Sequence, residues 1–414
     1  MVDIATEFAN NPKSANALRV VQRLQRENFS AYLVGGCVRD LLLGKAPKDF
    51  DVATNAHPEA VKALFNNARM VGRRFKIVHV RFGRDIIEVT TFRAPAKENE
   101  GEVSEGGMLL SDNVWGSFDE DVMRRDFTMN ALYFDPQTNQ ITDLVRGTDD
   151  IKAELIRLIG EPEQRYREDP VRMLRAARFE AKLGFNIEKK TAGAMKQLGF
   201  LLQDIPPARL FEEVLKLFMS GHGEASYESL VHHDLLGWLF PDTANVDSNL
   251  APKLVQLALA STDKRIQEHM PVTPAFILAA LLWWPFVTEK KRLISEGSTN
   301  LAASHEAALN VIAKQQFSIS IPKRFSGPMR DIWHLQARLP NTRGKKPEIL
   351  VGHKRFRAAY DFLLLREKSG EQLDDLGAWW TTYQEQNPIV PGASETPPDG
   401  RSRRPRKRRP KRAT

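Results

Sequence analysis

The stretch LVGGCVRDLLLGKAPKDFDVAT, residues 33–54, joins a short apolar strand, a Gly35-Gly36 turn and a helix that is expected to begin near Val38. Two glycines at a strand-to-helix turn let backbone N–H groups approach a triphosphate closely. Arg39, in the expected helix, can pair with the negative charge of such a ligand. The stretch therefore predicts a small α/β unit with a phosphate-binding turn.

Two carboxylates close this stretch. Asp49 and Asp51 are separated by one residue on a predicted strand, so their side chains project from the same face, with Cα atoms about 6.6 Å apart, while Phe50 points into the core. Carboxylates placed in this way can share Mg²⁺ ions, or Mn²⁺ in their place, which would bind a triphosphate and activate an attacking 3′-hydroxyl. An Asp-x-Asp by itself is more often a polar turn with a capping Asp, but the Gly-Gly turn upstream favours the metal site.

A third carboxylate has two candidates. The sequence RRDFTMNA, residues 124–131, places two arginines and Asp126 just ahead of a strand, and Asp126 could complete a metal-binding triad. Glu88, in the strand-like sequence IIEVTTFR, could serve equally well beside Asp49 and Asp51. The spacing does not separate these two possibilities.

The sequence EDPVRMLRAARF, residues 168–179, repeats Arg172, Arg175 and Arg178 along one predicted helix face, which suits contacts to phosphates or bases. Asp169 and Arg172 together present an acceptor and a donor, a pair that matches adenine or cytosine and disfavours guanine and uracil. This pattern does not choose between adenine and cytosine. The alternative is an ordinary helix start in which Asp169, followed by proline, is the N-cap.

Periodicity along the chain predicts an α/β head of mixed sheet and helices, followed by all-α regions. Residues 94–115 are polar and Gly-rich without periodicity, which indicates a mobile loop. The expected divisions are an N-terminal helical segment (residues 1–30), the head (31–150), a helical neck that binds base and RNA (151–220), a helical body and leg that bind RNA (221–387) and a disordered basic tail (388–414).

Composition favours a soluble protein of the reducing cytoplasm. The longest apolar stretch, residues 274–286, is too short to span a membrane, which takes roughly 20 residues, and the N-terminus lacks the pattern of a secretory signal. Cys37 is the single cysteine, which excludes an intramolecular disulfide framework and a cysteine-based zinc cluster. We expect a monomer without a transmembrane segment.

The net charge of +8 is concentrated in residues 400–414, which carry nine Lys and Arg and no acid. Subtracting these nine from +8 leaves about −1 for the remainder. A basic, Pro-interrupted run of this kind is attracted to polyanions, and RNA is the expected partner. The alternative is a tail that contributes only solubility.

These elements together resemble the class II nucleotidyltransferases, the family of CCA-adding tRNA nucleotidyltransferases and bacterial poly(A) polymerases. The sequence DLVRGTDDI, residues 143–151, is similar to the flexible hinge of that family. The resemblance implies roles for individual residues and favours Asp126 over Glu88. It implies that Asp49, Asp51 and Asp126 are the catalytic, metal-binding carboxylates, that Gly35, Gly36, Arg39 and Arg125 bind the triphosphate, and that Asp169, Arg172, Arg175 and Arg178 contact the base and phosphates.

Within the family, VGRRFKIVHV, residues 71–80, resembles the stretch that marks poly(A) polymerases, and so does the basic tail. The resemblance therefore implies addition of AMP from ATP to RNA 3′ ends without a template, by a two-metal mechanism. Such tails give exonucleases a foothold, so RNA-decay proteins are further expected partners. The alternatives are a CCA-adding enzyme and, in another class, a non-catalytic RNA-binding protein.

Overall fold

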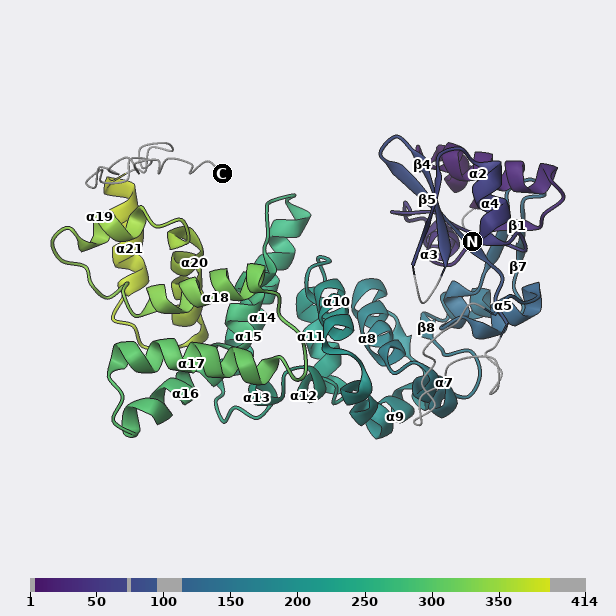
Figure 1. The fold of residues 1–414 in the computed structure, drawn as a ribbon. Coiled ribbons are helices and arrows are strands. Elements are labelled where there is room, and N and C mark those ends of the chain that lie inside the picture. The colour runs from purple at the N-terminus through teal and green to yellow at the C-terminus, as the bar shows by residue number, and fades with distance from the viewer. Residues whose placement is uncertain (1–3, 73–75, 95–113, 388–414) are drawn as a thin grey trace, which may run out of the picture.

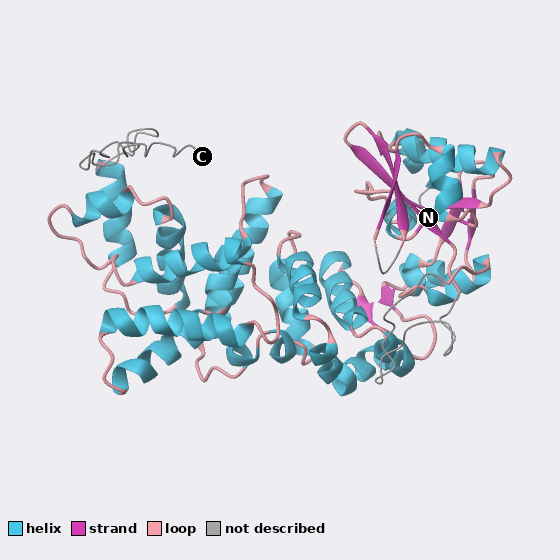
Figure 2. Cartoon of the chain, viewed as in Figure 1, coloured by secondary structure: helices cyan, strands magenta, loops and turns pink. Residues whose placement is uncertain are grey.

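The protein is elongated, with a sheet-containing head at one end and helices along the rest. The computed structural model describes residues 4–72, 76–94 and 114–387. Figure 1 shows the head at one end of an arch and the body at the other, and Figure 2 shows that the strands gather in and next to the head. The predicted mixed α/β head followed by helical regions is confirmed.

The head is built on a seven-stranded sheet in the order β3-β4-β5-β2-β1-β6-β7. Strands β2 and β5 pair in parallel and the other neighbours are antiparallel, so the sheet is mixed. The strands are β1 (Ala31–Val34), β2 (Asp51–Thr54), β3 (Ala68–Val71), β4 (Ile77–Phe82), β5 (Asp85–Thr91), β6 (Tyr133–Asp135) and β7 (Gln140–Thr142).

Short helices pack around this sheet. In α2, Ala17, Val20, Val21 and Leu24 recur at helical spacing and are buried, which fixes the helix against β1 and β2. Helix α3 begins at Gly36, two residues earlier than expected, directly after Gly35. The helices of the head are α1 (Ile4–Asn10), α2 (Ser14–Arg26), α3 (Gly36–Leu42), α4 (Pro58–Leu64), α5 (Phe118–Arg124), the 3₁₀ helix η1 (Thr128–Asn130) and α6 (Gly147–Lys152).

The neck starts with the short strand β8 (Leu155–Ile156), which pairs with β9 (Asn186–Ile187), so a two-stranded sheet interrupts a region that was expected to be all helical. In α10, a proline at the first turn sets the start, and Leu210, Val214 and Leu217 form the buried stripe. The neck helices are α7 (Pro162–Glu168), α8 (Val171–Leu183), α9 (Lys189–Leu198), the 3₁₀ helix η2 (Gly199–Asp204) and α10 (Pro207–Phe218).

The body is helical throughout its described residues. Its core is continuous with that of the neck, and a smaller cluster around Trp380 holds the last helices together. The body helices are α11 (Gly223–His232), α12 (Leu236–Leu239), α13 (Pro241–Ala244), α14 (Leu250–Gln267), α15 (Pro274–Leu281), α16 (Trp283–Ser295), α17 (Asn300–Gln315), α18 (Lys323–Gln336), α19 (Lys346–Val351), α20 (Phe356–Ser369) and α21 (Leu376–Gln386).

Three sequence predictions concern residues that lie outside the part of the chain that the structure describes. The basic tail (388–414) and the specificity stretch around residues 73–75 lie outside the described residues, as does most of the expected mobile loop. At the base of that loop, Arg93 and Trp115 form an antiparallel bridge. Among the described helices, none combines the length and the apolar character needed to cross a membrane.

Candidate active site

Strand pairing assembles the first carboxylates of the site. Asp51 is the first residue of β2, and it lies between Val34 at the end of β1 and Glu88 on β5. Asp49 precedes the strand and is exposed, while Asp51 is partly buried. The turn at Gly35 follows Val34 directly, so the strand register places the turn, Asp51 and Glu88 side by side across the interior strands β1, β2 and β5, where β1 ends and β2 begins. We call this place the anionic edge of the head.

The electrostatics of Asp51 indicate an anionic cluster. Burial raises the pKa of Asp51 to about 6, and the negative charges of Glu88 and Asp49 add to this effect, while Arg125 opposes it. Carboxylates that raise one another's pKa are stabilised by a bound cation, and oxygen ligands suit hard divalent ions. In the described part of the chain, no group of three or more His, Cys, Asp or Glu side chains is already arranged as a metal site.

Asp126 is engaged elsewhere. Its Oδ1 accepts hydrogen bonds from the backbone N–H of Phe127 (2.8 Å) and from Asn130 Nδ2 (3.2 Å). Its Oδ2 accepts from Arg175 Nε (2.8 Å) and Nη2. Burial opposes the charge, yet Arg175 and these hydrogen bonds lower the pKa of Asp126 to about 2. The structure therefore joins Asp126 to the neck, and it is Glu88 that pairs beside Asp51.

Arg125 borders the Gly-Gly turn. A Cβ atom at Gly35, whose φ is +79°, would lie 3.8 Å from Arg125 Nη1. Arg125 Nε donates to the Tyr133 hydroxyl (2.7 Å), and Nη2 donates to Asp121 (3.0 Å). Burial disfavours the charged form, but Tyr133 and Asp121 more than offset it, so the pKa of Arg125 lies above its usual value. A permanent cation thus stands next to the predicted triphosphate-binding turn.

Arg39 has a different setting from the one expected. Its guanidinium is only 2% exposed, and it donates to Asp40 Oδ1 through Nε (2.9 Å) and Nη2 (2.6 Å). Its Nη1 donates to Asn130 Oδ1 (2.7 Å). Arg39 Nη2 would also lie 3.5 Å from a Cβ at Gly36. The Asp40 carboxylate and Asn130 thus hold the Arg39 guanidinium in a buried position next to the turn. A contact between Arg39 and the triphosphate stays a prediction.

Arg39, Arg175 and Arg178 surround one phenyl ring of the neck. Their guanidinium carbons lie 5.1, 5.6 and 4.9 Å from the centroid of Phe179, a cation–π geometry. Arg175 points to Asp126, and Arg178 is partly buried with an Nε that has no hydrogen-bond partner among the described residues. The expected basic stripe therefore packs against the head.

Asp169 and Arg172 are both fixed by neighbours. Arg209 Nη2 donates to both carboxylate oxygens of Asp169, at 2.9 and 3.0 Å. Arg172 Nη1 donates to the Arg165 carbonyl (2.6 Å) and to Glu168 (3.1 Å). Asp169 makes no side-chain capping bond to α8, so the ordinary helix-cap alternative is not adopted. Both the expected acceptor, Asp169, and the expected donor, Arg172, are therefore held in place by neighbouring residues.

Sequence reasoning missed several residues that organise this region. Asp121 binds Arg125, the Tyr133 hydroxyl and the Arg93 backbone N–H, and its position four residues before Arg125 is the one signal that the sequence offers. Arg165 donates to the carbonyls of Arg124 and Arg125. The remaining members are Glu168 and Arg209. Glu88 was not missed, since the sequence offers it as a competing candidate, and its Oε1 lies 3.4 Å from His79 Nε2.

Four arginines come together where the head meets the neck. Burial and the positive charges of Arg93, Arg172 and Arg165 lower the pKa of Arg124 to about 9. Burial and Arg172 lower the pKa of Arg165 to about 10. Guanidinium groups that lower one another's pKa are stabilised by an anion. The junction therefore combines an anionic edge in the head with a cationic wall, as a ligand carrying phosphates and metal would require.

Three family models match this chain. The "Poly A polymerase head domain" matches residues 31–157, the "Probable RNA and SrmB- binding site of polymerase A" matches residues 184–246, and the "Polymerase A arginine-rich C-terminus" matches residues 296–413. The three matched segments follow one another from the head to the tail.

Two poly(A) polymerases are similar to this chain over most of its length. Poly(A) polymerase I of Escherichia coli O6:H1 is 47% identical over 96% of this chain and 90% of the relative. Poly(A) polymerase I of Haemophilus influenzae is 45% identical over 92% of this chain and 88% of the relative. A CCA-adding enzyme of Lactobacillus helveticus is 40% identical over 51% of this chain and 52% of the relative.

Among solved structures, the CCA-adding enzyme of Bacillus stearothermophilus in complex with CTP superposes with a TM-score of 0.65 and 27% identity, over 92% of this chain and 84% of that one. The Thermotoga maritima CCA-adding enzyme complexed with tRNA has the same fold, with a TM-score of 0.63 and 19% identity, over 93% and 85%. The matched domains and the similarity over about nine tenths of both chains agree, and the chain belongs to the poly(A) polymerase family of nucleotidyltransferases.

Proposed function

We propose that this chain is a template-independent poly(A) polymerase that transfers AMP from ATP to the 3′ ends of RNA. The observation that carries the proposal is the extent of similarity. It runs over about nine tenths of both chains for the poly(A) polymerases and over about half for the CCA-adding enzyme of Lactobacillus helveticus.

The chemistry is a nucleotidyl transfer. The RNA 3′-oxygen bonds to the α-phosphorus of ATP, the bond to the β-phosphate oxygen breaks, pyrophosphate leaves, and the hydroxyl proton is lost. Divalent cations, Mg²⁺ or Mn²⁺, would supply charge neutralisation and make the 3′-hydroxyl more acidic when bound, as in two-metal enzymes. The raised pKa of Asp51 supports a cation site at the head edge.

The carboxylates take different roles in this proposal. Asp49 and Asp51 hold the cations, and the register of β2 and β5 favours Glu88 over Asp126 as the third ligand. Asp126, which the family resemblance places among the ligands, is instead proposed as a positioning residue, because its Oδ2 fixes Arg175 of the neck and because Glu88, not Asp126, pairs beside Asp51. This choice can be tested separately from the activity itself.

The remaining residues bind the nucleotide. Backbone N–H groups of the Gly35-Gly36 turn and the Arg125 guanidinium would contact the triphosphate, and Arg39 would hold that turn in place. Asp169, held by Arg209, is the acceptor for the adenine amino group, and Arg172 is the donor. Arg175 and Arg178 would add positive charge beside the phosphates.

The decisive experiment is nucleotide incorporation by the purified protein with Mg²⁺. ATP and CTP are offered separately and together to an oligo(A) primer and to tRNA lacking its CCA end. Long ladders with ATP on oligo(A) are the expected result. Addition limited to C, C and A on the tRNA would instead identify a CCA-adding enzyme, and no addition with any combination would leave an RNA-binding protein.

Several finer expectations follow from the family assignment. Adenylate tails would give exonucleases a foothold, so the proposed cellular role is to promote RNA decay together with decay proteins. We further propose that the enzyme works as a monomer and that it is located in the cytoplasm; the single cysteine supports the reducing compartment.

A further inference from the structure

The body contains a cavity of about 490 Å³ that is lined mainly by basic side chains. It lies between α17, α18 and the turn that precedes α20. Its charged and titratable residues are Lys323, Arg324, Arg330, Lys354 and Arg355, the imidazoles of His305 and His334, and the carboxylate of Asp331. Five permanent cations therefore face this space together with one carboxylate.

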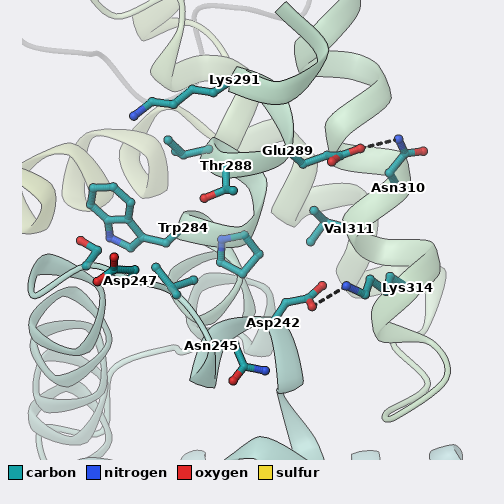
Figure 3. A pocket seen from close by; sticks show the side chains of 14 residues that line it. Asp242, Asn245, Asp247, Trp284, Thr288, Glu289, Lys291, Asn310, Val311 and Lys314 are labelled. Carbon is teal, nitrogen blue, oxygen red and sulfur yellow. Dashed lines mark hydrogen bonds and ion pairs between the residues drawn. The ribbon is translucent and has the colours of Figure 1, made fainter. Parts of the chain in front are cut away.

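These cations lack counterions. Within the described ranges, none of the five lysines and arginines of this cavity takes part in an ion pair, and Arg355 Nε is buried without a hydrogen-bond partner. Another cavity of the body, of about 670 Å³, differs in this respect (Figure 3). There Lys314 contacts Asp242 at 2.6 Å and Glu289 accepts from Asn310 at 2.8 Å. Uncompensated basic groups point to an anionic ligand.

Two histidines, His305 and His334, lie next to each other in the lining of this cavity. The ring centroids of His305 on α17 and His334 on α18 are 4.3 Å apart, with a tilt of 33°. Burial lowers the pKa of His334, and the positive charges of His305, Arg330 and Lys290 on α16 add to this, while Asp331 opposes it. A phosphate placed among these groups would favour the protonated imidazole, so anion binding and proton uptake are coupled at this wall.

A second cavity lies beside the first and shares two of its lining residues. A neighbouring cavity of about 240 Å³ shares Lys354 and Arg355 and is also lined by Arg265 and Arg357. Arg357 is paired with Asp361, so the second cavity is less cationic. Two cavities that share Lys354 and Arg355 and each contain further arginines suit a ligand that repeats its charge rather than a single small anion. We call the lining of both cavities the basic groove.

We propose that the basic groove binds successive phosphodiester groups of the RNA strand upstream of its 3′ end. The choice of RNA as the polyanion rests on the proposed function. The residues of the first cavity all fall within the segment, residues 296–413, that matches the arginine-rich C-terminal domain of polymerase A. The groove thus holds the primer by its backbone, without reading its sequence.

The test uses the full chain with the charge-reversal variant Arg330→Glu/Lys354→Glu. The matched control is Lys253→Glu, an exposed lysine of α14 that does not line the groove. Binding of fluorescent oligo(A) is measured over a range of salt concentrations. The slope of log affinity against log salt is expected to fall by roughly 0.7 for each phosphate group that the variant no longer binds, and the control keeps the wild-type slope. An unchanged slope in the double variant overturns the proposal.

Activity on a trinucleotide primer separates this proposal from the proposed function. The double variant is expected to extend the trinucleotide with the wild-type kcat and the wild-type KM for ATP, while its KM for long oligo(A) rises. Absence of transfer by the wild-type protein itself would count against the proposed function. An equal rise in KM for both primers in the variant would place its effect outside the groove and overturn the inference.

The histidine pair supplies a second test that does not depend on charge reversal. The affinity of the wild-type chain for oligo(A) is expected to rise between about pH 8 and about pH 6, and His305→Gln/His334→Gln is expected to lose that rise. Inorganic phosphate serves as the competing probe. If phosphate shifts the histidine NMR signals while oligo(A) affinity is the same in the wild type and both variants, the groove is a free-anion site and the RNA assignment is wrong.

Discussion

The head–neck junction and the basic groove both gather lysine and arginine side chains, but they differ in how that charge is compensated. At the junction, Asp126 binds Arg175 and Asp169 binds Arg209. The cations of the first cavity of the groove have no such partners within the described residues. Paired cations hold other groups in position, whereas unpaired ones are available to a ligand. In the proposed function, the contrast separates the residues that orient ATP and the reacting groups from the residues that hold the RNA.

The largest effect is expected at the anionic edge of the head. Asp51→Asn should lower kcat by roughly 1,000-fold or more, which corresponds to the several kcal/mol that a metal clamp contributes. Single-turnover AMP transfer to oligo(A) measures this decrease, and the melting temperature checks the fold. Glu59→Gln, at an exposed position of α4, is the control and should retain full activity. If Asp51→Asn turns over at the wild-type rate, the proposal that Asp51 holds a catalytic cation is wrong.

Glu88→Gln sharpens the choice of the third carboxylate. We expect kcat to fall by at least roughly 100-fold, with RNA affinity unchanged, because Glu88 is proposed as a direct ligand of the cation and 100-fold is the upper end for groups that only support such ligands. The dependence of the rate on Mg²⁺ concentration should move to higher concentrations in this variant. If the Mg²⁺ dependence moves with Asp126→Asn and not with Glu88→Gln, the family-based assignment is correct and the strand-based one is wrong.

Asp126→Asn is expected to affect stability more than Mg²⁺ dependence. The fall of its pKa from 3.8 to about 2 corresponds to about 2 kcal/mol of stability. Because the folded-state pKa is the lower one, this contribution is complete above about pH 4 and disappears as the pH falls towards about 2. Urea unfolding of the wild type and the variant across this range measures it. Asp234→Asn, at an exposed position, should cost little at any pH.

The smallest effect concerns base selection. Arg209→Met removes the group that fixes Asp169, so we expect the KM for ATP to rise about tenfold, with kcat less affected and the preference for ATP over CTP reduced. Competition between ATP and CTP on oligo(A) measures the ratio of AMP to CMP incorporated. Arg338→Met, which removes an exposed arginine of the body, is the matched control. An unaltered ratio in Arg209→Met would mean that Asp169 does not need its partner.

The fold class followed from periodicity because buried faces repeat at fixed spacings, as α2 and α10 illustrate. The pairing of Asp51 with Glu88 could not be derived, since it depends on a parallel register between strands separated by α4, β3 and β4. The contact between Asp169 and Arg209 joins residues that are far apart in sequence. Burial of Arg39 depends on Asn130, which had given no signal of its own.

The parallel pairing of β2 and β5 has a consequence for insertions and deletions. Side chains alternate between faces along a strand, so one residue added to β5 before Glu88 would send its carboxylate to the opposite face and bring an apolar neighbour beside Asp51. The β4–β5 turn is different, because Gly83 has a φ of +63° and open space around it. Changes in length between homologous chains should therefore collect at this hairpin tip and be absent from the strand that follows it.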